Sequence, residues 1–312
     1  DFTYGRFDGS INAYQKETTD LLLDVPVLQP APSPTKLENV GSVENQGLEF
    51  SLEAYVFDRE NMTLSVGGNI STNKNEITSL GPRDFIDHTP VSGPGQTNVN
   101  AQRLAAGHPI GAFYGPKFVG TTEEGLEQYA TEDGTTTSLT EAKNQFIGNP
   151  APDFSYGLNI DFDYQAFDVS AFFRGEQGKQ LFNNTALEFG YLSKLGTSNI
   201  LRSALNDGVS ADVTPAYSSR WIQNASYFRL DNLTVGYTLP NTGRFGLQRA
   251  RIYASAQNVF TITPYDGYDP EVNTNVTGRG LGFRNLSRPT RGVDYTSYPR
   301  PRTFTLGVQL SL

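Results

Sequence analysis

The stretch YPRPRTFTLGVQLSL, residues 298–312, sets a pattern that recurs through the sequence. Every second residue is apolar, namely Phe304, Leu306, Val308, Leu310 and Leu312. The residues between them are small or polar, namely Thr303, Thr305, Gly307, Gln309 and Ser311. An alternation of period two places successive side chains on opposite faces of a β-strand. The stretch therefore predicts a strand with one apolar face and one polar face.

The same alternation occurs in seven further segments. They are residues 5–15, 47–57, 62–72, 154–164, 167–175, 226–239 and 250–262. Strands of globular proteins typically contain about five or six residues, whereas a tilted membrane-spanning strand needs roughly nine to eleven. The polar faces are rich in Ser, Thr, Asn and Gly, which suit the lining of a wide aqueous lumen. The pattern favours eight antiparallel membrane-spanning strands over the alternative, a soluble β-sandwich adhesin or carbohydrate-binding module with an apolar core.

The connections between the predicted strands alternate between short and long. The short ones are DREN (58–61), QA (165–166) and the moderate 240–249 segment, and the long ones are 16–46, 73–153, 175–224 and 264–300. Outer-membrane barrels pair short periplasmic turns with long extracellular loops. The direction of each strand then requires that 73–153 contain no membrane crossing or two. Because GAFYGPKFVG (111–120) is broken by glycines and a proline, we expect an extracellular excursion without crossings.

Eight strands are too few for the lumen that these polar faces imply. An eight-stranded barrel has an interior just wide enough to be filled by side chains, and here those side chains are small. An open sheet in lipid would leave backbone groups unpaired, at a cost of several kcal/mol for each group. We therefore expect the eight strands to belong to a larger barrel whose earlier strands are absent from residues 1–312.

Composition excludes several classes of function. The net charge of −9 and the pI near 4.8 argue against a nucleic-acid partner. The chain has no Cys and only two His, His88 and His108, so thiolate chemistry, metal ligation and His-based catalysis have little support. No enzyme activity, cofactor or metal is expected.

Several longer blocks carry a resemblance to a known family. They are NVGSVENQGLEFSL (39–52), GHPIGAFYGPKFVG (107–120), IGNPAPDFSYGLNIDFDYQAFDVSAFFRGEQG (147–178), SRWIQNASYFRLDNLTVGYTLP (219–240), RIYASAQNVFTITPYDGYDPEVN (251–273) and YPRPRTFTLGVQLSL (298–312). Together they resemble the C-terminal portion of SusC/RagA-family TonB-dependent outer-membrane transporters of Bacteroidetes. The blocks follow one another in the family's order along nearly the whole chain.

The resemblance implies an all-β fold, the C-terminal part of a large plugged barrel with long extracellular loops. It implies active uptake of oligosaccharides or peptides across the outer membrane, with a SusD-like surface lipoprotein as partner and energy from the TonB complex. The plug domain and the N-terminal strands are expected to lie outside residues 1–312. We expect the loops 73–153, 175–224 and 264–300 to contact the lipoprotein. A siderophore- or cobalamin-type TonB-dependent receptor without a lid is the alternative.

The loop sequence YDGYDPEVN (265–273) is a candidate substrate-binding segment. Tyr265 and Tyr268 are candidates for stacking on sugar rings. Asp269 and Glu271 are candidate polar contacts, and with Asp266 they offer oxygen atoms of the kind that Ca²⁺ prefers, although the spacing differs from an EF-hand loop. The alternative is that this acidic segment caps a strand end and packs against neighbouring loops.

A few further residues are singled out by type. Trp221 precedes a predicted strand, so an aromatic belt at the outer membrane interface and a sugar platform are both considered for it. The same belt is predicted to include Tyr156, Tyr164 and Tyr237 on the lipid-facing side. On the polar face, we predict a charge pair between Arg174 and Asp168.

Overall fold

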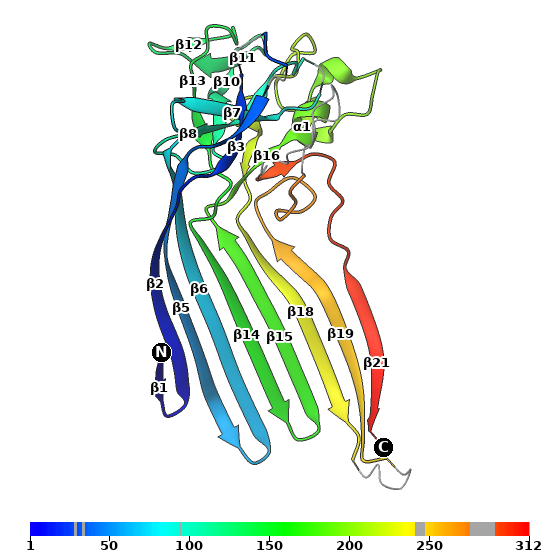
Figure 1. The fold of residues 1–312 in the computed structure, drawn as a ribbon. Helices are drawn as coiled ribbons and strands as arrows, with labels where there is room; N and C mark the ends of the chain where they lie inside the picture. The colour runs from blue at the N-terminus through cyan, green and yellow to red at the C-terminus, as the bar shows by residue number, and fades with distance from the viewer. Residues whose placement is uncertain (28–29, 33–34, 94, 241–246, 275–290, 312) are drawn as a thin grey trace.

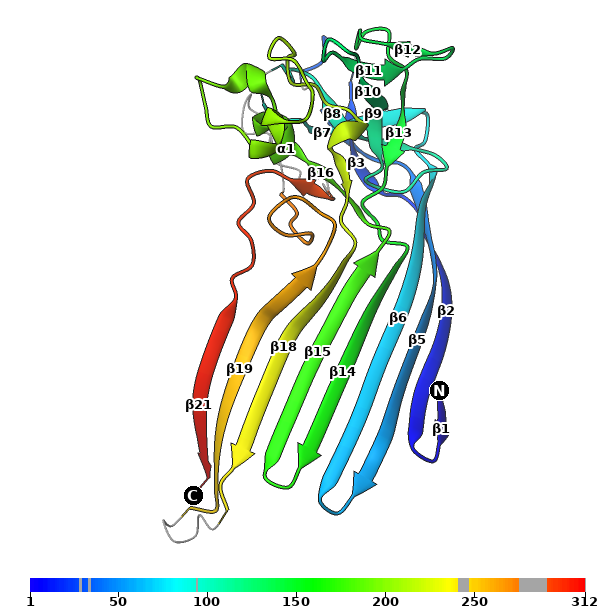
Figure 2. The same cartoon turned by 180° about the vertical axis from the view of Figure 1, so that it is seen from behind.

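The computed structural model describes residues 1–27, 30–32, 35–93, 95–240, 247–274 and 291–311. One large antiparallel sheet carries a layer of smaller elements at one of its ends (Figure 1). We call these smaller elements the loop layer, and we call the opposite end of the sheet the turn end. Figure 2 shows the same arrangement from behind, with the loop layer again confined to one end of the sheet.

Nine strands form the large sheet, in the order β1-β2-β5-β6-β14-β15-β18-β19-β21. Their bounds are β1 (Phe2–Tyr4), β2 (Phe7–Thr18), β5 (Ser42–Arg59), β6 (Met62–Ser79), β14 (Phe154–Tyr164), β15 (Phe167–Gln177), β18 (Tyr227–Thr238), β19 (Arg249–Ile262) and β21 (Thr303–Ser311). The eight predicted strands and their antiparallel arrangement are confirmed, and β1 adds a strand of three residues.

The register of the sheet keeps the alternation of each strand aligned with that of its neighbours. Ile160 of β14 lies opposite Ala171 of β15. Ile252 of β19 lies opposite Val308 of β21. Because opposed residues point to the same side of a sheet, the apolar positions of all strands share one face and the polar positions share the other. We call these the apolar face and the polar face.

The apolar face is uncovered along the described strands. On β21, Phe304 is 73% exposed and Leu306 is 79% exposed, and large apolar residues of the other long strands are exposed in the same way. No second sheet of the described residues packs over them, because the remaining sheets have only two to four strands and lie in the loop layer. The soluble β-sandwich alternative is therefore wrong, since its core would require this face to be buried.

Aromatic side chains on the apolar face gather toward the two ends of the strands. Near the loop layer, contacting rings link Phe154, Tyr156, Phe173, Phe228 and Phe260. At the turn end, Phe162 stacks with Tyr164 and Phe167 contacts Tyr237. Tyr156, Tyr164 and Tyr237 thus lie on the predicted face, but the prediction of one shared belt is wrong, because Tyr156 lies near the loop layer and Tyr164 and Tyr237 lie at the turn end. Girdles of this kind mark the two interfaces of membrane barrels.

The short connections lie at the turn end, where only Glu60 and Asn61 separate β5 from β6 and only Gln165 and Ala166 separate β14 from β15. The long connections enter the loop layer (Figures 1 and 2). After β6, the chain contributes no strand to the large sheet until β14. The prediction that this excursion makes no crossing is therefore confirmed. Residues 241–246 of the 240–249 turn and 275–290 of the 264–300 loop lie outside the described residues.

The described part of the loop layer contains short strands, one α-helix and three 3₁₀ helices. They are β3 (Leu22–Pro26), β4 (Thr35–Asn39), β7 (Phe85–Pro90), β8 (Asn100–Ala105), β9 (Phe113–Pro116), β10 (Phe118–Thr121), β11 (Glu127–Ala130), β12 (Thr135–Thr136), β13 (Asn144–Gly148), β16 (Gln180–Asn183), α1 (Asn184–Phe189), η1 (Leu192–Lys194), η2 (Arg202–Leu205), η3 (Ser219–Trp221), β17 (Ile222–Asn224) and β20 (Val293–Asp294). None of the described helices is long and apolar enough to cross a membrane.

A conventional buried core is found in the loop layer. Its main cluster includes Phe113, Phe182, Leu187, Tyr191 and Trp221, contributed by segments far apart in the sequence. Beside it, the buried carboxylate of Glu127 accepts hydrogen bonds from the Tyr191 hydroxyl and from the Arg220 guanidinium. Burial, together with the Glu127 charge, raises the pKa of the Tyr191 hydroxyl. The loop layer is thus a packed body rather than a set of independent loops.

Candidate functional site

Irregular pairing brings three charged residues together on the polar face near the loop layer. Arg174 of β15 lies directly opposite Arg229 of β18. The register between these strands shifts next to this pair, so Asp231 is an extra residue on β18. The Asp231 carboxylate accepts a hydrogen bond from Arg174 Nε at 2.9 Å. Since like charges on directly opposed residues destabilise a sheet, this position needs neighbouring carboxylates.

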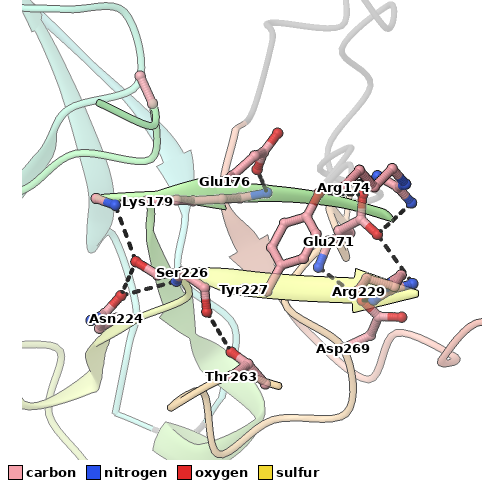
Figure 3. Close-up of polar contacts among 12 residues, drawn as sticks. Arg174, Glu176, Lys179, Asn224, Ser226, Tyr227, Arg229, Thr263, Asp269 and Glu271 are labelled. Carbon is pink, nitrogen blue, oxygen red and sulfur yellow. Dashed lines mark hydrogen bonds and ion pairs between the residues drawn. The ribbon is translucent and has the colours of Figure 1, made fainter. Parts of the chain in front are cut away.

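The connection after β19 supplies two more carboxylates to the same place (Figure 3). Glu271 accepts hydrogen bonds from both terminal nitrogens of Arg174, and Arg174 Nη2 lies 2.8 Å from Glu271 Oε2. Its Oε2 also lies 3.1 Å from Arg229 Nη1, and its Oε1 accepts a hydrogen bond of 2.9 Å from the Tyr227 hydroxyl. Asp269 Oδ1 accepts a 2.7 Å hydrogen bond from Arg229 Nη2. We call this set of residues the arginine–carboxylate cluster.

The cluster holds residues 263–274 against the polar face. Arg229 is 1% exposed and Asp269 is 4% exposed, so the ion pairs are shielded from water. A second attachment lies nearby, where the buried Tyr265 hydroxyl donates a 2.7 Å hydrogen bond to Asp294 Oδ2. Burial raises the pKa of Tyr265 and that of Asp294. The connection is therefore anchored at both Tyr265 and Glu271.

These contacts separate the predicted substrate-binding residues into two groups. The oxygen atoms of Asp269 and Glu271, and the hydroxyl of Tyr265, are already engaged within the chain. Tyr268 is 68% exposed and offers its ring to the surroundings. This placement matches the packing alternative for the segment. A substrate-binding role for these four residues and for Trp221 stays a prediction. Within the described residues, no group of three or more His, Asp or Glu side chains is arranged to hold a metal ion.

Trp221 lies in the core of the loop layer, so the interpretation as part of a membrane belt is wrong. Its ring packs against Tyr191, and its indole N–H donates a 3.1 Å hydrogen bond to the Ala216 carbonyl. The guanidinium of Arg220 lies 4.7 Å from the ring centroid. A residue so enclosed is separated from the apolar face of the sheet by the loop layer around it.

The predicted charge pair between Arg174 and Asp168 is also wrong, although both residues lie on the polar face. Asp168 lies near the turn end and accepts hydrogen bonds from Arg251, with Arg251 Nε at 2.8 Å from Oδ1. Gly236 lies opposite Asp168 on β18, and a side chain there would collide with both partners. Arg174 lies six positions from Asp168 along β15, too far for a contact between their side chains. It pairs with Asp231 and Glu271 instead.

The polar face also carries an open hollow of about 820 Å³ beneath the loop layer. Neighbouring residues of β2, β5 and β6 form its floor, centred on Tyr14, Gly47 and Asn73. Segments around residues 107–109 and 149–153 bound it from the side of the loop layer. The sequence did not single out these residues. The available signal was Tyr14 itself, an aromatic residue at a position where the alternation calls for a polar one.

Comparisons with known proteins agree with this geometry. Residues 1–259 match the family model described as TonB dependent receptor-like, beta-barrel. TonB-dependent receptor P3 of Formosa agariphila is 34% identical over 98% of this chain and 32% of its own length. TonB-dependent receptor SusC of Bacteroides thetaiotaomicron is 30% identical over 99% of this chain and 30% of its own length.

Solved structures show the same fold. The RagAB peptide importer in the "open-open" state superposes with a TM-score of 0.81 at 24% identity, covering 98% of this chain and 33% of that chain. The structure titled as the RagAB peptide transporter gives a TM-score of 0.78 at 22% identity. The nine-stranded antiparallel sheet, with one apolar and one polar face, is a segment of the wall of a large β-barrel. The chain belongs to the TonB-dependent receptor family, and the relatives that it resembles in sequence include SusC. It spans about a third of the length of these relatives.

Proposed function

We propose that the chain is the C-terminal part of the barrel of an outer-membrane transporter that takes up oligosaccharides or peptides with energy from the TonB complex. One observation carries this proposal: the large sheet exposes apolar residues on one face and polar residues on the other, and the described parts of the long connections lie at one end. Lipid contacts the apolar face, and the substrate path runs along the polar face. No covalent chemistry is assigned to the chain.

Further strands of the same protein complete the barrel. In the described sheet, β1 with β2 and β21 form the two edges and have no partner strand on their outer sides. Unpaired backbone groups in lipid cost several kcal/mol each, so these edges need partners. The shared fold with structures roughly three times as long supports strands and a plug domain that lie outside residues 1–312.

A SusD-like surface lipoprotein docks on the loop layer. The relative named SusC and the neighbours titled RagAB support a partner of this type. The described loop layer offers a preformed surface, since its core and its buried Glu127–Arg220 ion pair hold distant segments together. Exposed apolar residues on it, such as Leu195, Leu205 and Tyr298, are the kind of side chain that a partner covers.

Deleting the gene for the full-length protein in its own host tests the proposal. We expect loss of uptake of labelled oligosaccharides or peptides, and we expect the tagged protein to fractionate with the outer membrane together with a lipoprotein. Unchanged uptake of both substrate classes would contradict the proposed function. Purification without any lipoprotein, combined with siderophore or cobalamin uptake, would favour the lidless receptor.

A further inference from the structure

We infer that the hollow on the polar face is a subsite for a neutral oligosaccharide, with the Tyr14 ring as a platform for one sugar ring. The inference rests on the proposed function, because a transporter wall is what brings a substrate to this face. The hollow measures about 820 Å³, within the range of roughly 300–1,000 Å³ that is typical of ligand sites.

Tyr14 is held flat against the sheet by the absence of a side chain at residue 47. Gly47 of β5 lies opposite Tyr14 of β2. A Cβ atom at Gly47 would lie 2.6 Å from the Tyr14 hydroxyl oxygen and 2.7 Å from Cζ, so the ring occupies the space above the glycine. Tyr14 is nonetheless 38% exposed and lines the hollow. One face of the ring therefore packs on the backbone, and the other is open.

The polar groups around this ring have unused hydrogen-bonding capacity. The Tyr14 hydroxyl donates a 2.9 Å hydrogen bond to Asn73 Oδ1, which leaves the Asn73 amide protons as donors. Asn149 Oδ1 accepts from the Ala151 backbone, so its amide protons are donors as well. The Asp153 carboxylate is an acceptor, and no hydrogen bond to it is found among the described residues. Tyr14, Asn73, Asn149 and Asp153 are all among the residues that line the hollow.

The boundary of the hollow is fixed before any ligand arrives. Asn75 Oδ1 accepts a 2.9 Å hydrogen bond from the Ile110 backbone N–H, and Asn75 Nδ2 donates to Asn45 Oδ1 at 2.9 Å. These bonds hold the segment that includes Pro109 over the sheet. A preformed site spends less of its binding free energy on ordering its own side chains.

The chemistry fits a neutral sugar. A sugar ring has an apolar C–H face and an edge of hydroxyl groups. The electron-rich face of an aromatic ring attracts the C–H face, and carboxamides and a carboxylate serve the hydroxyls as donors and acceptors. The charged residues Lys74 and Glu76 of β6 alternate with Asn73 and Asn75, so their side chains project from the opposite face, where Lys74 Nζ lies 2.8 Å from Glu76 Oε2. An anionic ligand would meet the Asp153 carboxylate, so a neutral one is favoured.

Calorimetry on the full-length protein in detergent tests this assignment, with neutral glucose hexasaccharides of different linkages as probes. The hexasaccharide that binds the wild-type protein is then used to measure binding to each variant. We expect Tyr14→Ala to weaken binding about tenfold or more, because it removes the stacking surface. Tyr14→Phe keeps the ring and is expected to stay within about threefold of the wild type. Asp153→Ala is expected to weaken binding without touching the ring.

Tyr253→Ala is the matched control. Tyr253 of β19 lies over Gly307 of β21 on the same face, with Cζ 2.4 Å from the position of a Cβ atom there. It does not line the hollow. Wild-type binding in Tyr253→Ala and weakened binding in Tyr14→Ala and Asp153→Ala support the subsite. If Tyr14→Ala fails to fold, Asp153→Ala and Tyr14→Phe decide.

Two results would overturn the inference and are distinguishable from a failure of the proposed function. A hexasaccharide that binds Tyr14→Ala and Asp153→Ala as tightly as the wild type would place the sugar elsewhere while leaving transport intact. Binding of peptides but of no hexasaccharide would overturn the sugar class and would also leave transport intact. Transport itself fails only if the gene deletion described above has no effect on uptake.

Discussion

Arg174 of β15 and Arg229 of β18 lie directly opposite each other, and the carboxylate of Glu271 contacts both guanidinium groups. Two cations in opposed positions repel each other, so the sheet is stable here only while carboxylates lie between them. Glu271 comes from the connection between β19 and β21, whereas Asp231 comes from the sheet itself. The charge of the barrel wall thus determines where this connection rests.

Glu271→Gln is predicted to loosen the connection from the wall. The variant leaves Arg229 buried with one carboxylate fewer, and removing one partner of a buried ion pair costs about 3 kcal/mol. We expect faster hydrogen exchange at the backbone amides of residues 265–274 in the full-length protein.

Glu53→Gln is the control for this prediction, since Glu53 is exposed and no hydrogen bond or ion pair involving its side chain is found among the described residues. Its exchange pattern should match that of the wild type. Equal exchange in the wild type and in Glu271→Gln would show that the arginine–carboxylate cluster does not anchor the connection.

Arg220→Met is predicted to destabilise the loop layer. The Glu127 side chain is 2% exposed, and the substitution leaves its charge buried without its cation. We expect a loss of about 3 kcal/mol in the unfolding of the loop layer, measured by pulse proteolysis. The double variant Arg220→Met with Glu127→Leu should recover much of this loss, because both charges are gone. A double variant less stable than Arg220→Met would argue against the pair.

Asp294→Asn is predicted to stabilise the attachment of Tyr265 near neutral pH. Burial raises the pKa of Asp294 above its ordinary value of 3.8. A carboxyl group with a raised pKa in the folded state contributes stability below the unfolded pKa, and this contribution is lost as the pH rises through the folded pKa. The variant cannot ionise, so its advantage over the wild type should be largest at about pH 7 and vanish below about pH 4. Thermal unfolding of the full-length protein across this range measures the difference. An advantage that is greatest in acid would contradict the prediction.

Leu306→Lys and Thr305→Lys are neighbours on β21 that face opposite sides of the sheet. Lysine on the lipid side costs about 2 to 4 kcal/mol at the middle of the bilayer, whereas lysine in an aqueous lumen costs little. We expect Leu306→Lys to reduce the amount of folded protein in the outer membrane and Thr305→Lys to leave it near the wild-type amount. Heat-modifiable migration of the folded barrel in gels measures both. Equal effects of the two substitutions would be inconsistent with a lipid-facing side.

Local alternation was sufficient to predict the eight long strands, because the period of two in residues such as Phe304 and Leu306 is imposed directly by strand geometry. It also predicted which side chains share a face. The short strand β1 was missed because three residues are too few to show a period. Chain direction limited the excursion after β6 to no crossing or two, and the glycines and proline of 111–120 favoured none.

Contacts between distant segments were beyond the reach of the sequence pattern. Arg174 was assigned to Asp168 because both share a face, but the partners that it contacts lie 57 and 97 positions away. A membrane interface was one of two positions considered for Trp221, because the residue precedes a predicted strand. Its burial in the core of the loop layer could not be predicted, because that core is built from distant segments without a periodic pattern. The hollow depends on Tyr14 meeting Gly47, which only the register between β2 and β5 brings about.

The central claim is that the apolar face contacts lipid while the polar face contacts water. The chain has no Cys, so single cysteines can be placed in turn at residues 303–310 of the full-length protein, in an otherwise cysteine-free background. We predict alternation: a membrane-impermeant thiol reagent labels positions 303, 305, 307 and 309, and a spin label at 304, 306, 308 and 310 is accessible to oxygen in the bilayer. Labelling by the aqueous reagent at every position, or at positions 304, 306 and 308 in preference to their neighbours, would contradict the account.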